Sequence, residues 1–296
     1  AMSKKYIDNT LLLDKRNDYW LTDGLQTYLM MNYVSEYYPE IKLAGNISKI
    51  WGFKNFNFSK LNFNDKYPFI YQYTARQFID QALNTRSDSL SNFNRKIAGK
   101  YKAGLGLRYL ADYIGDSIIS ASFQEFYLKN NLKYAKSDDF KKIVSSKTTK
   151  DISWFFEDYL KTTKKIDYTI KKAIIKDDSV YVTIKNKRNM TAPVALYGLK
   201  NKQVKFKKWL TNIDSTKTIA IPKNGFNRVS LNFENSYPEF NSMDNWKKVG
   251  KNILNKPIQF KFFKDINDPY YNQLYIQPNI KYNFYDGALL GLRIHN

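Results

Sequence analysis

The chain has 296 residues, no cysteine and a formal net charge of +21, and 43% of its residues are hydrophobic. This composition excludes an intrinsically disordered chain, disulfides and thiolate metal sites, and the length gives room for two domains with separate cores. The charge permits binding to nucleic acid or to an anionic membrane, but the dispersed lysines accompany no nucleic-acid-binding motif, which favours a solvated surface and no specific nucleic-acid partner.

The N-terminal residues, AMSKKYIDNT, lack the apolar core of a signal peptide. No run of about 18 apolar residues predicts a transmembrane helix. Because Ala1 precedes Met2, we expect the chain to be a piece of a longer protein.

Residues 1–165 are predicted to form an antiparallel helical bundle or array. Apolar residues recur at helical spacing, and capping residues such as Asp116 and Gly115 mark the ends of helices. The expected helices cover residues 21–38, 68–83, 102–115, 116–131, 137–148 and 151–161.

Residues 166–238 change to an alternation of apolar and polar residues, which is typical of strands. Several short strands in about 70 residues predict a β-sandwich. The expected strands lie within 167–188, which turns at Asp177-Asp178, and at 194–199, 203–210, 216–222 and 228–233. In the basic segment KFKKWL, the alternation places Phe206 in the core and the lysines in solvent.

Residues 239–296 read as a linker, with a short helix near Trp246, followed by a β-hairpin that turns at residues 285–287. An isolated hairpin is marginal in water, so this tail either packs on the body or begins a further C-terminal β region. The fold class is therefore multi-domain α + β, with helices first and an all-β sandwich after them.

Two stretches carry a resemblance to a known family. DYWLTDGLQTY, residues 18–28, resembles the LWLNEGFATY segment of aminopeptidase-N-type zinc metallopeptidases, the gluzincins. Residues 107–162 resemble that family's later helices: Gly115-Asp116 begins one helix, an acid-Phe pair begins the next, and D-x-x-W-F-F closes the domain. The resemblance covers about residues 4–165, and a β-sandwich after the helices agrees with the family's domain order.

The resemblance implies a degenerate zinc site. The family binds zinc with a His-Glu-x-x-His helix and with the glutamate of LNEG, nineteen positions after the second histidine. Here Asp23 stands at the glutamate and Lys4 at that histidine. A protonated lysine has no lone pair for a metal, and aspartate is one methylene shorter than glutamate. We therefore expect no metal in this chain, and a contact between Asp23 and Lys4 across the former site.

The family's transition-state tyrosine corresponds to Lys100, two positions before Lys102-Ala103-Gly104. Tyr101 is a possible substitute, but a helix turns about 100° per residue, so a neighbour points elsewhere. Tyr71 is a rival that is better explained by packing. The single histidine, His295, is expected to be an exposed terminal residue, since one imidazole without partners makes no site. Because these positions are degenerate, we assign no catalytic residue.

The expected function is that of a catalytically inactive relative of these peptidases, with a peptide-binding or scaffolding role in a larger envelope protein. The resemblance implies a bacterial periplasmic, outer-membrane or cell-surface location, and membrane association through a region C-terminal to this chain. Peptides are the expected partners.

Two alternatives remain open. In the first, the chain is the C-terminal part of an active zinc metalloaminopeptidase. A His-Glu-x-x-His helix upstream of residue 1 would then supply the missing ligands, with Asp23 as an unusual third ligand. In the second, the chain is a basic protein that binds an anionic membrane or nucleic acid.

Overall fold

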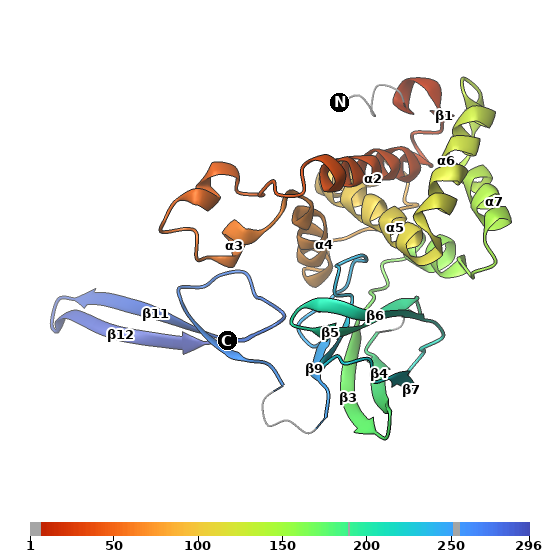
Figure 1. The fold of residues 1–296 in the computed structure, drawn as a ribbon. Coiled ribbons are helices and arrows are strands. Elements are labelled where there is room, and N and C mark those ends of the chain that lie inside the picture. Colours follow the sequence, from red (N-terminus) through yellow and green to blue (C-terminus); the bar gives the residue numbers. More distant parts are fainter. Residues whose placement is uncertain (1–6, 189, 251–254) are drawn as a thin grey trace.

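The computed structural model describes residues 7–188, 190–250 and 255–296 and places a helical unit against two antiparallel sheets. In Figure 1 the helices lie above the sheets, and a third, small sheet projects from the side of the molecule. This arrangement confirms the expected fold class, a multi-domain α + β protein in which helices precede sheets.

Among the described residues, the helical unit contains a helical stretch at residues 7–10, six further α-helices and four short turns. The α-helices are α2 (Tyr19–Tyr37), α3 (Asn57–Lys60), α4 (Lys66–Arg76), α5 (Gly99–Ile114), α6 (Asp116–Asn130) and α7 (Ser137–Lys147). The 3-10 turns are η1 (Gly45–Lys49) and η2 (Phe63–Asp65), and the π-helical turns are η3 (Asn94–Ala98) and η4 (Trp154–Tyr159). A parallel pair, β1 (Leu12–Leu13) and β2 (Tyr134–Ala135), joins the two ends of the unit. In the described part of the chain, none of the helices combines the length and apolarity that a membrane span requires.

The boundary between α5 and α6 is set by a local residue, whereas the end of α4 is set by a long-range contact. Gly115, with φ of 122°, separates α5 from α6 as the sequence predicts, because this backbone conformation favours glycine. The helix expected over 68–83 is wrong at its end: α4 stops at Arg76, and Phe78 adopts φ of 55°. The turn brings Asp80 into contact with Lys165, 85 residues later.

Helices α2 and α5 approach each other through small residues. A Cβ atom at Gly24 would lie 2.9 Å from the Cβ of Ala103, and one at Gly104 would overlap the side chain of Thr27. Real Cβ atoms almost never come this close, so both glycines are needed for the approach. We call Gly24, Ala103 and Gly104 the small-residue contact of α2 and α5.

The β-sandwich has a three-stranded and a four-stranded sheet. The first has the order β3 (Tyr168–Lys176), β4 (Ser179–Asn186), β7 (Thr216–Pro222). The second has the order β6 (Gln203–Leu210), β5 (Val194–Lys200), β8 (Arg228–Leu231), β9 (Trp246–Lys248). The short helix expected near Trp246 is wrong, because this segment pairs with β8 as strand β9. Phe206 is half-buried and packs against the core, as predicted.

One buried core runs from the helices into the sandwich. At the junction, the Tyr109 hydroxyl of α5 donates a hydrogen bond to the carbonyl of Pro193, and its ring lies 4.3 Å from Trp154 and 4.8 Å from Tyr237 between centroids. Lys207 of β6 adds an ion pair to Asp112 of α5 at 2.9 Å. The helical unit and the sandwich therefore pack as one body, while the boundaries at 165 and 238 stay predictions.

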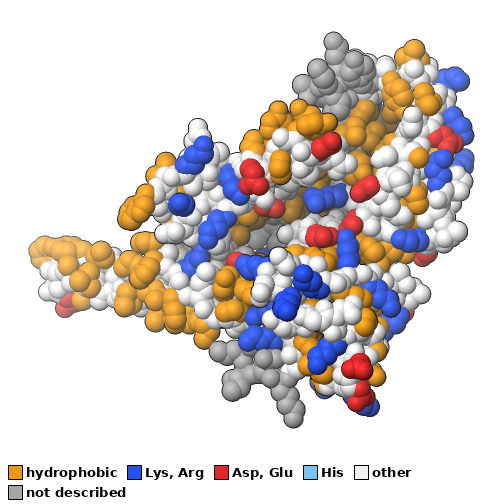
Figure 2. All heavy atoms as spheres, viewed as in Figure 1, with side chains coloured by type: hydrophobic (Ala, Val, Ile, Leu, Met, Phe, Trp, Pro, Cys, Tyr) orange, Lys and Arg blue, Asp and Glu red, His pale blue; other side chains and the backbone are white. Residues whose placement is uncertain are grey.

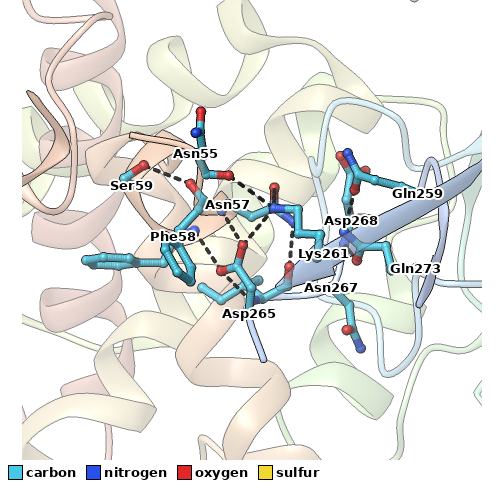
Figure 3. Close-up of polar contacts among 12 residues, drawn as sticks. Asn55, Asn57, Phe58, Ser59, Gln259, Lys261, Asp265, Asn267, Asp268 and Gln273 are labelled. Atoms are coloured by element: carbon cyan, nitrogen blue, oxygen red, sulfur yellow. Dashed lines mark hydrogen bonds and ion pairs between the residues drawn. The ribbon is translucent and has the colours of Figure 1, made fainter. Parts of the chain in front are cut away.

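The tail forms a third sheet from β10 (Ile258–Phe262), β11 (Asn272–Asn283) and β12 (Gly287–His295). The antiparallel β11–β12 hairpin confirms the expected one, whereas the parallel strand β10 was not predicted. Figure 3 shows how the sheet is held: Lys261 donates to the Asn57 side chain at 2.8 Å, and Asp265 accepts from the Asn57 backbone N–H at 2.5 Å. These contacts attach the tail to the loop around α3.

Candidate functional site

Two of the three degenerate positions lie together. Asp23 of α2 and Lys100 of α5 form an ion pair, with 3.2 Å between Nζ and Oδ1. Their side chains are 33% exposed for Lys100 and 19% for Asp23, so the pair is partly shielded from water. The pair lies beside the small-residue contact, since Gly24 follows Asp23 in the chain. The sequence identified both residues but did not pair them with each other. The expected partner of Asp23, Lys4, lies outside the described residues.

Asp23 sits deeper in its helix than expected. Helix α2 begins at Tyr19, which places Asp23 in the second turn instead of the first, and Asp18 holds the N-cap position. Tyr19 lies beside the pair. Burial raises the pKa of Tyr19 above its usual range, and the carboxylate of Asp23 acts in the same direction. The Tyr19 hydroxyl is buried and has no hydrogen-bond partner among the described residues. The neighbourhood thus combines one carboxylate, one ammonium and one neutral phenol.

These groups do not fit the zinc ion that the family resemblance implies. A catalytic zinc site takes three protein ligands with available lone pairs. Asp23 offers one carboxylate, whereas the ammonium of Lys100 offers no lone pair and repels a dication. Across the parts of the chain that the structure describes, no three His, Cys, Asp or Glu side chains form a group able to hold a metal. Whether the protein binds zinc stays a prediction.

The remaining candidates lie in packing positions. Tyr101 stacks edge-on against Tyr67, with ring centroids 4.7 Å apart, and Tyr71 is buried in the same small cluster between α2, α4 and α5. Burial raises the pKa of Tyr71 far above its usual range, so it stays a neutral phenol. His295 is half-buried and stacks on Tyr275, which corrects the expectation of an exposed terminal residue.

A buried charge cluster around Asp80 was not predicted from the sequence. We call Asp80, Lys102 and Lys165 the buried triad. Lys165 donates to both carboxylate oxygens of Asp80 at 2.5 Å, and the Lys102 Nζ lies 3.8 Å from Asp80 Oδ2. All three side chains are at most 6% exposed. The one available signal was Lys102 directly before the largely apolar segment AGLGLRYL, and it gave no indication of its partners.

The triad holds one more positive charge than negative. Burial lowers the pKa of Lys102 from 10.5 to about 8, Asp80 opposes this change, and Lys165 adds to it. A lysine amine in this range loses its proton more readily than an exposed one. The Lys102 Nζ also donates to the carbonyl of Thr162 at 3.4 Å, at the start of the connection to the sandwich.

Next to the triad, a pocket of about 420 Å³ opens between the helical unit and the sandwich. It is lined by Phe78 and Thr163 and by charged side chains of which four are basic and one is acidic: Lys164, Lys165, Lys187, Arg188 and Asp80. Arg188 lies over the ring of Phe240 at 3.9 Å. Each of the four cations pairs with a carboxylate of the chain: Lys164 with Asp158, Lys165 with Asp80, Lys187 with Asp244 and Arg188 with Asp167. A ligand with a carboxylate would have to compete with these ion pairs.

Glu239 is a buried acid in the sandwich junction. It accepts hydrogen bonds from the Tyr168 backbone N–H at 3.2 Å and from Asn245 at 2.6 Å. Burial nevertheless raises the pKa of Glu239 to about 8 from 4.5. The folded protein therefore keeps a proton on this residue over a pH range in which the unfolded chain has released it.

This proton predicts a pH dependence of stability. Because the folded pKa is raised, the contribution is fully present below about pH 4.5 and is lost as the pH rises towards 8. We expect wild type to lose about 3 kcal/mol of unfolding free energy through Glu239 between pH 5 and pH 8. Urea unfolding at both pH values should show this loss in wild type and a smaller one in Glu239→Gln. Glu36→Gln, at an exposed glutamate of α2, is the control and should retain the wild-type slope. An unchanged slope in Glu239→Gln would contradict the prediction.

Solved structures include several with a similar fold. Aminopeptidase A from Legionella pneumophila, in a crystal structure with aspartic acid, matches this structure with a TM-score of 0.50 at 15% sequence identity. The chain has a peptidase-like fold. The match covers 74% of this chain and 23% of that protein, so the chain spans less than a quarter of the aminopeptidase. At this identity the likeness concerns the fold alone. No protein-family model matches the sequence, and no match to a curated protein was found.

Proposed function

We propose that this chain is a non-catalytic relative of the aminopeptidase-N-type zinc peptidases that serves in binding or scaffolding. The observation that carries the proposal is the ion pair between Asp23 and Lys100. By the family resemblance, these two positions would hold a zinc ligand and the transition-state tyrosine. In this chain they neutralise each other.

The electrostatics of the pair argue against a shared role in hydrolysis. A carboxylate paired with an ammonium at 3.2 Å has lost part of its affinity for a dication, because the ammonium already supplies positive charge beside it. A tyrosine hydroxyl can donate a hydrogen bond near a metal without carrying a charge. Lys100 cannot take this role, because its ammonium group repels the metal ion. A working site would need both positions restored.

The basic pocket supports a binding role. It lies at the junction of the helical unit and the sandwich, and its four cations pair with the carboxylates of Asp80, Asp158, Asp167 and Asp244. A ligand would therefore bind by replacing one of these partners. Under the proposal it takes the carboxylate of a peptide, and this peptide is bound without being cleaved. The envelope location and a role inside a larger protein belong to the same proposal and rest on the family resemblance.

The test measures zinc and hydrolysis together. We expect the purified chain, after incubation with zinc and dialysis, to retain less than about 0.1 zinc per chain, because a single carboxylate ligand does not retain the ion. We expect no turnover of aminoacyl-p-nitroanilides. Inductively coupled plasma mass spectrometry and absorbance at the nitroaniline band provide the two measurements, with a zinc-loaded aminopeptidase as the positive control.

Two variants sharpen the result. Lys100→Ala removes the ammonium beside Asp23, and Lys96→Ala removes an exposed lysine one turn earlier. Both should remain without stoichiometric zinc. The same measurements on the longest natural form of the protein decide the alternative with an upstream His-Glu-x-x-His helix. About one zinc per chain with peptide turnover in that form would overturn the proposal.

A further inference from the structure

The tail sheet has one face made almost wholly of apolar side chains. The strand registers align Phe262 with Ile276 and Ile276 with Ile294, and they align Ile280 with Leu290. Since alternate residues of a strand share a face, the even-numbered residues of β10, β11 and β12 lie on one side. We call this side the apolar face. Its six most prominent members are each 65–81% exposed: Phe260, Phe262, Ile280, Leu290, Leu292 and Ile294.

The opposite face of the same sheet is turned towards the body. It carries Gln273 and Tyr275, which are buried, and Lys261, which is bonded to Asn57 and Asp265. This reverses the usual arrangement, in which a sheet packs its apolar side inward and leaves its polar side in water. The polar contacts of Lys261 and Asp265 with Asn57, drawn in Figure 3, hold the polar side of the sheet against the loop around α3. The apolar face on the other side of the sheet stays exposed. Figure 2 shows the resulting hydrophobic side chains along the projecting hairpin.

The hairpin tip adds two exposed aromatic rings. Phe284 and Tyr285 are 90% and 96% exposed. Phenyl and phenol rings of this kind accumulate at the boundary between lipid headgroups and hydrocarbon. Lys281 and Arg293 lie at odd-numbered positions, on the opposite face of the same strands, and Asp286 is the single acid of residues 272–295. The hairpin therefore carries more positive than negative side chains, which favours an anionic surface.

We propose that the apolar face docks onto a membrane surface that contains anionic lipids. An exposed apolar surface of this extent marks a contact with another molecule or with a membrane. The net charge of +21 favours a membrane over a second copy of the chain. Two copies repel each other, whereas an anionic membrane attracts each copy. The charge brings the protein to the surface, and the apolar face holds it there.

Vesicle sedimentation tests this inference with the whole chain. The vesicles contain equal parts of phosphatidylcholine and phosphatidylglycerol, and pure phosphatidylcholine vesicles serve for comparison. We expect wild type to bind the anionic vesicles, and Leu290→Ser combined with Leu292→Ser to lower the partition coefficient about tenfold. This double variant changes no charge, and both residues are exposed, so the fold is retained.

The matched control is Leu128→Ser combined with Leu132→Ser. These leucines are 69% and 66% exposed but lie at the end of α6, away from the tail. The control should bind within about twofold of wild type. At high salt, wild type should retain more binding than the tail variant, because screening weakens charge attraction and leaves the apolar contact in place.

Several results would overturn the proposal. Equal binding of the tail variant and wild type would mean that charge alone attracts the protein. Absence of binding to anionic vesicles, with a concentration-dependent dimer that the tail variant abolishes, would assign the apolar face to a second copy. Neither result bears on zinc binding or hydrolysis, so the function proposed above is tested separately.

Discussion

Replacing Asp80 by alanine is expected to lower the free energy of unfolding by about 3 to 5 kcal/mol. Asp80 is the single carboxylate of the buried triad and faces Lys165 at 2.5 Å and Lys102 at 3.8 Å. Its removal leaves two ammonium groups in a site almost closed to water. Lys102, with its pKa already lowered to about 8, relieves part of the cost by releasing its proton. Urea unfolding at pH 7 measures the change.

The control for this prediction is Asp88→Ala. Asp88 also pairs with two cations, Arg16 at 2.5 Å and Arg86 at 3.0 Å, but its side chain is 46% exposed. Exposed pairs contribute less than about 1 kcal/mol, so the same substitution should have a small effect here. If both variants lost the same small amount, the buried triad would be no more important than a surface pair.

A second variant separates charge from packing. Adding Lys165→Met to Asp80→Ala removes one of the two unpaired ammonium groups, and we expect this to recover part of the lost stability. Should Asp80→Ala fail to fold, Asp80→Asn keeps the shape of the side chain and allows the same comparison. A double variant that is less stable than Asp80→Ala would show that Lys165 stabilises the fold through its packing.

The sequence predicted elements that local patterns determine. Strands β6 and β7 agree with the expected ranges 203–210 and 216–222, because alternation over seven or eight residues specifies the strand. Strand β9 has three residues, too few for a pattern, and it forms because β8 offers a free edge. The end of α4 was missed because the contact of Asp80 with Lys165 overrides helical periodicity.

The site was predictable only in part. The resemblance identified Asp23 and Lys100 as changed positions, but a motif describes one segment at a time. The pairing of these two residues depends on how α2 crosses α5, 77 positions apart along the chain, and nothing local specifies that crossing. The buried triad joins three segments in the same way. Four of the six named residues of the apolar face belong to the predicted β11–β12 hairpin, whereas Phe260 and Phe262 join it through the register of β10 with β11, which the sequence did not predict.

The crossing of α2 and α5 itself can be tested at Gly104. We expect Gly104→Val to lower the free energy of unfolding by about 3 kcal/mol. Helix propensity alone would favour the replacement of glycine by up to about 1 kcal/mol. The valine side chain, however, would overlap Thr27. Since the Cβ of Thr27, which no side-chain rotation moves, would lie 2.5 Å from the added Cβ, no rotamer of Thr27 relieves the overlap, and the helices must separate. Urea unfolding measures the loss.

The control is Gly52→Val, because a Cβ at Gly52 meets nothing within 4 Å. We expect that variant to stay within about 0.5 kcal/mol of wild type. The double variant Thr27→Gly with Gly104→Ala has the smaller side chain on α2 and the larger one on α5. It should be more stable than Gly104→Val. If Gly104→Val were as stable as Gly52→Val, the close approach of the helices would be wrong. Because Thr27 bonds the carbonyl of Asp23 at 2.8 Å, separated helices would also pull Asp23 away from Lys100. The ion pair that carries the proposed loss of zinc chemistry therefore depends on glycine at position 104.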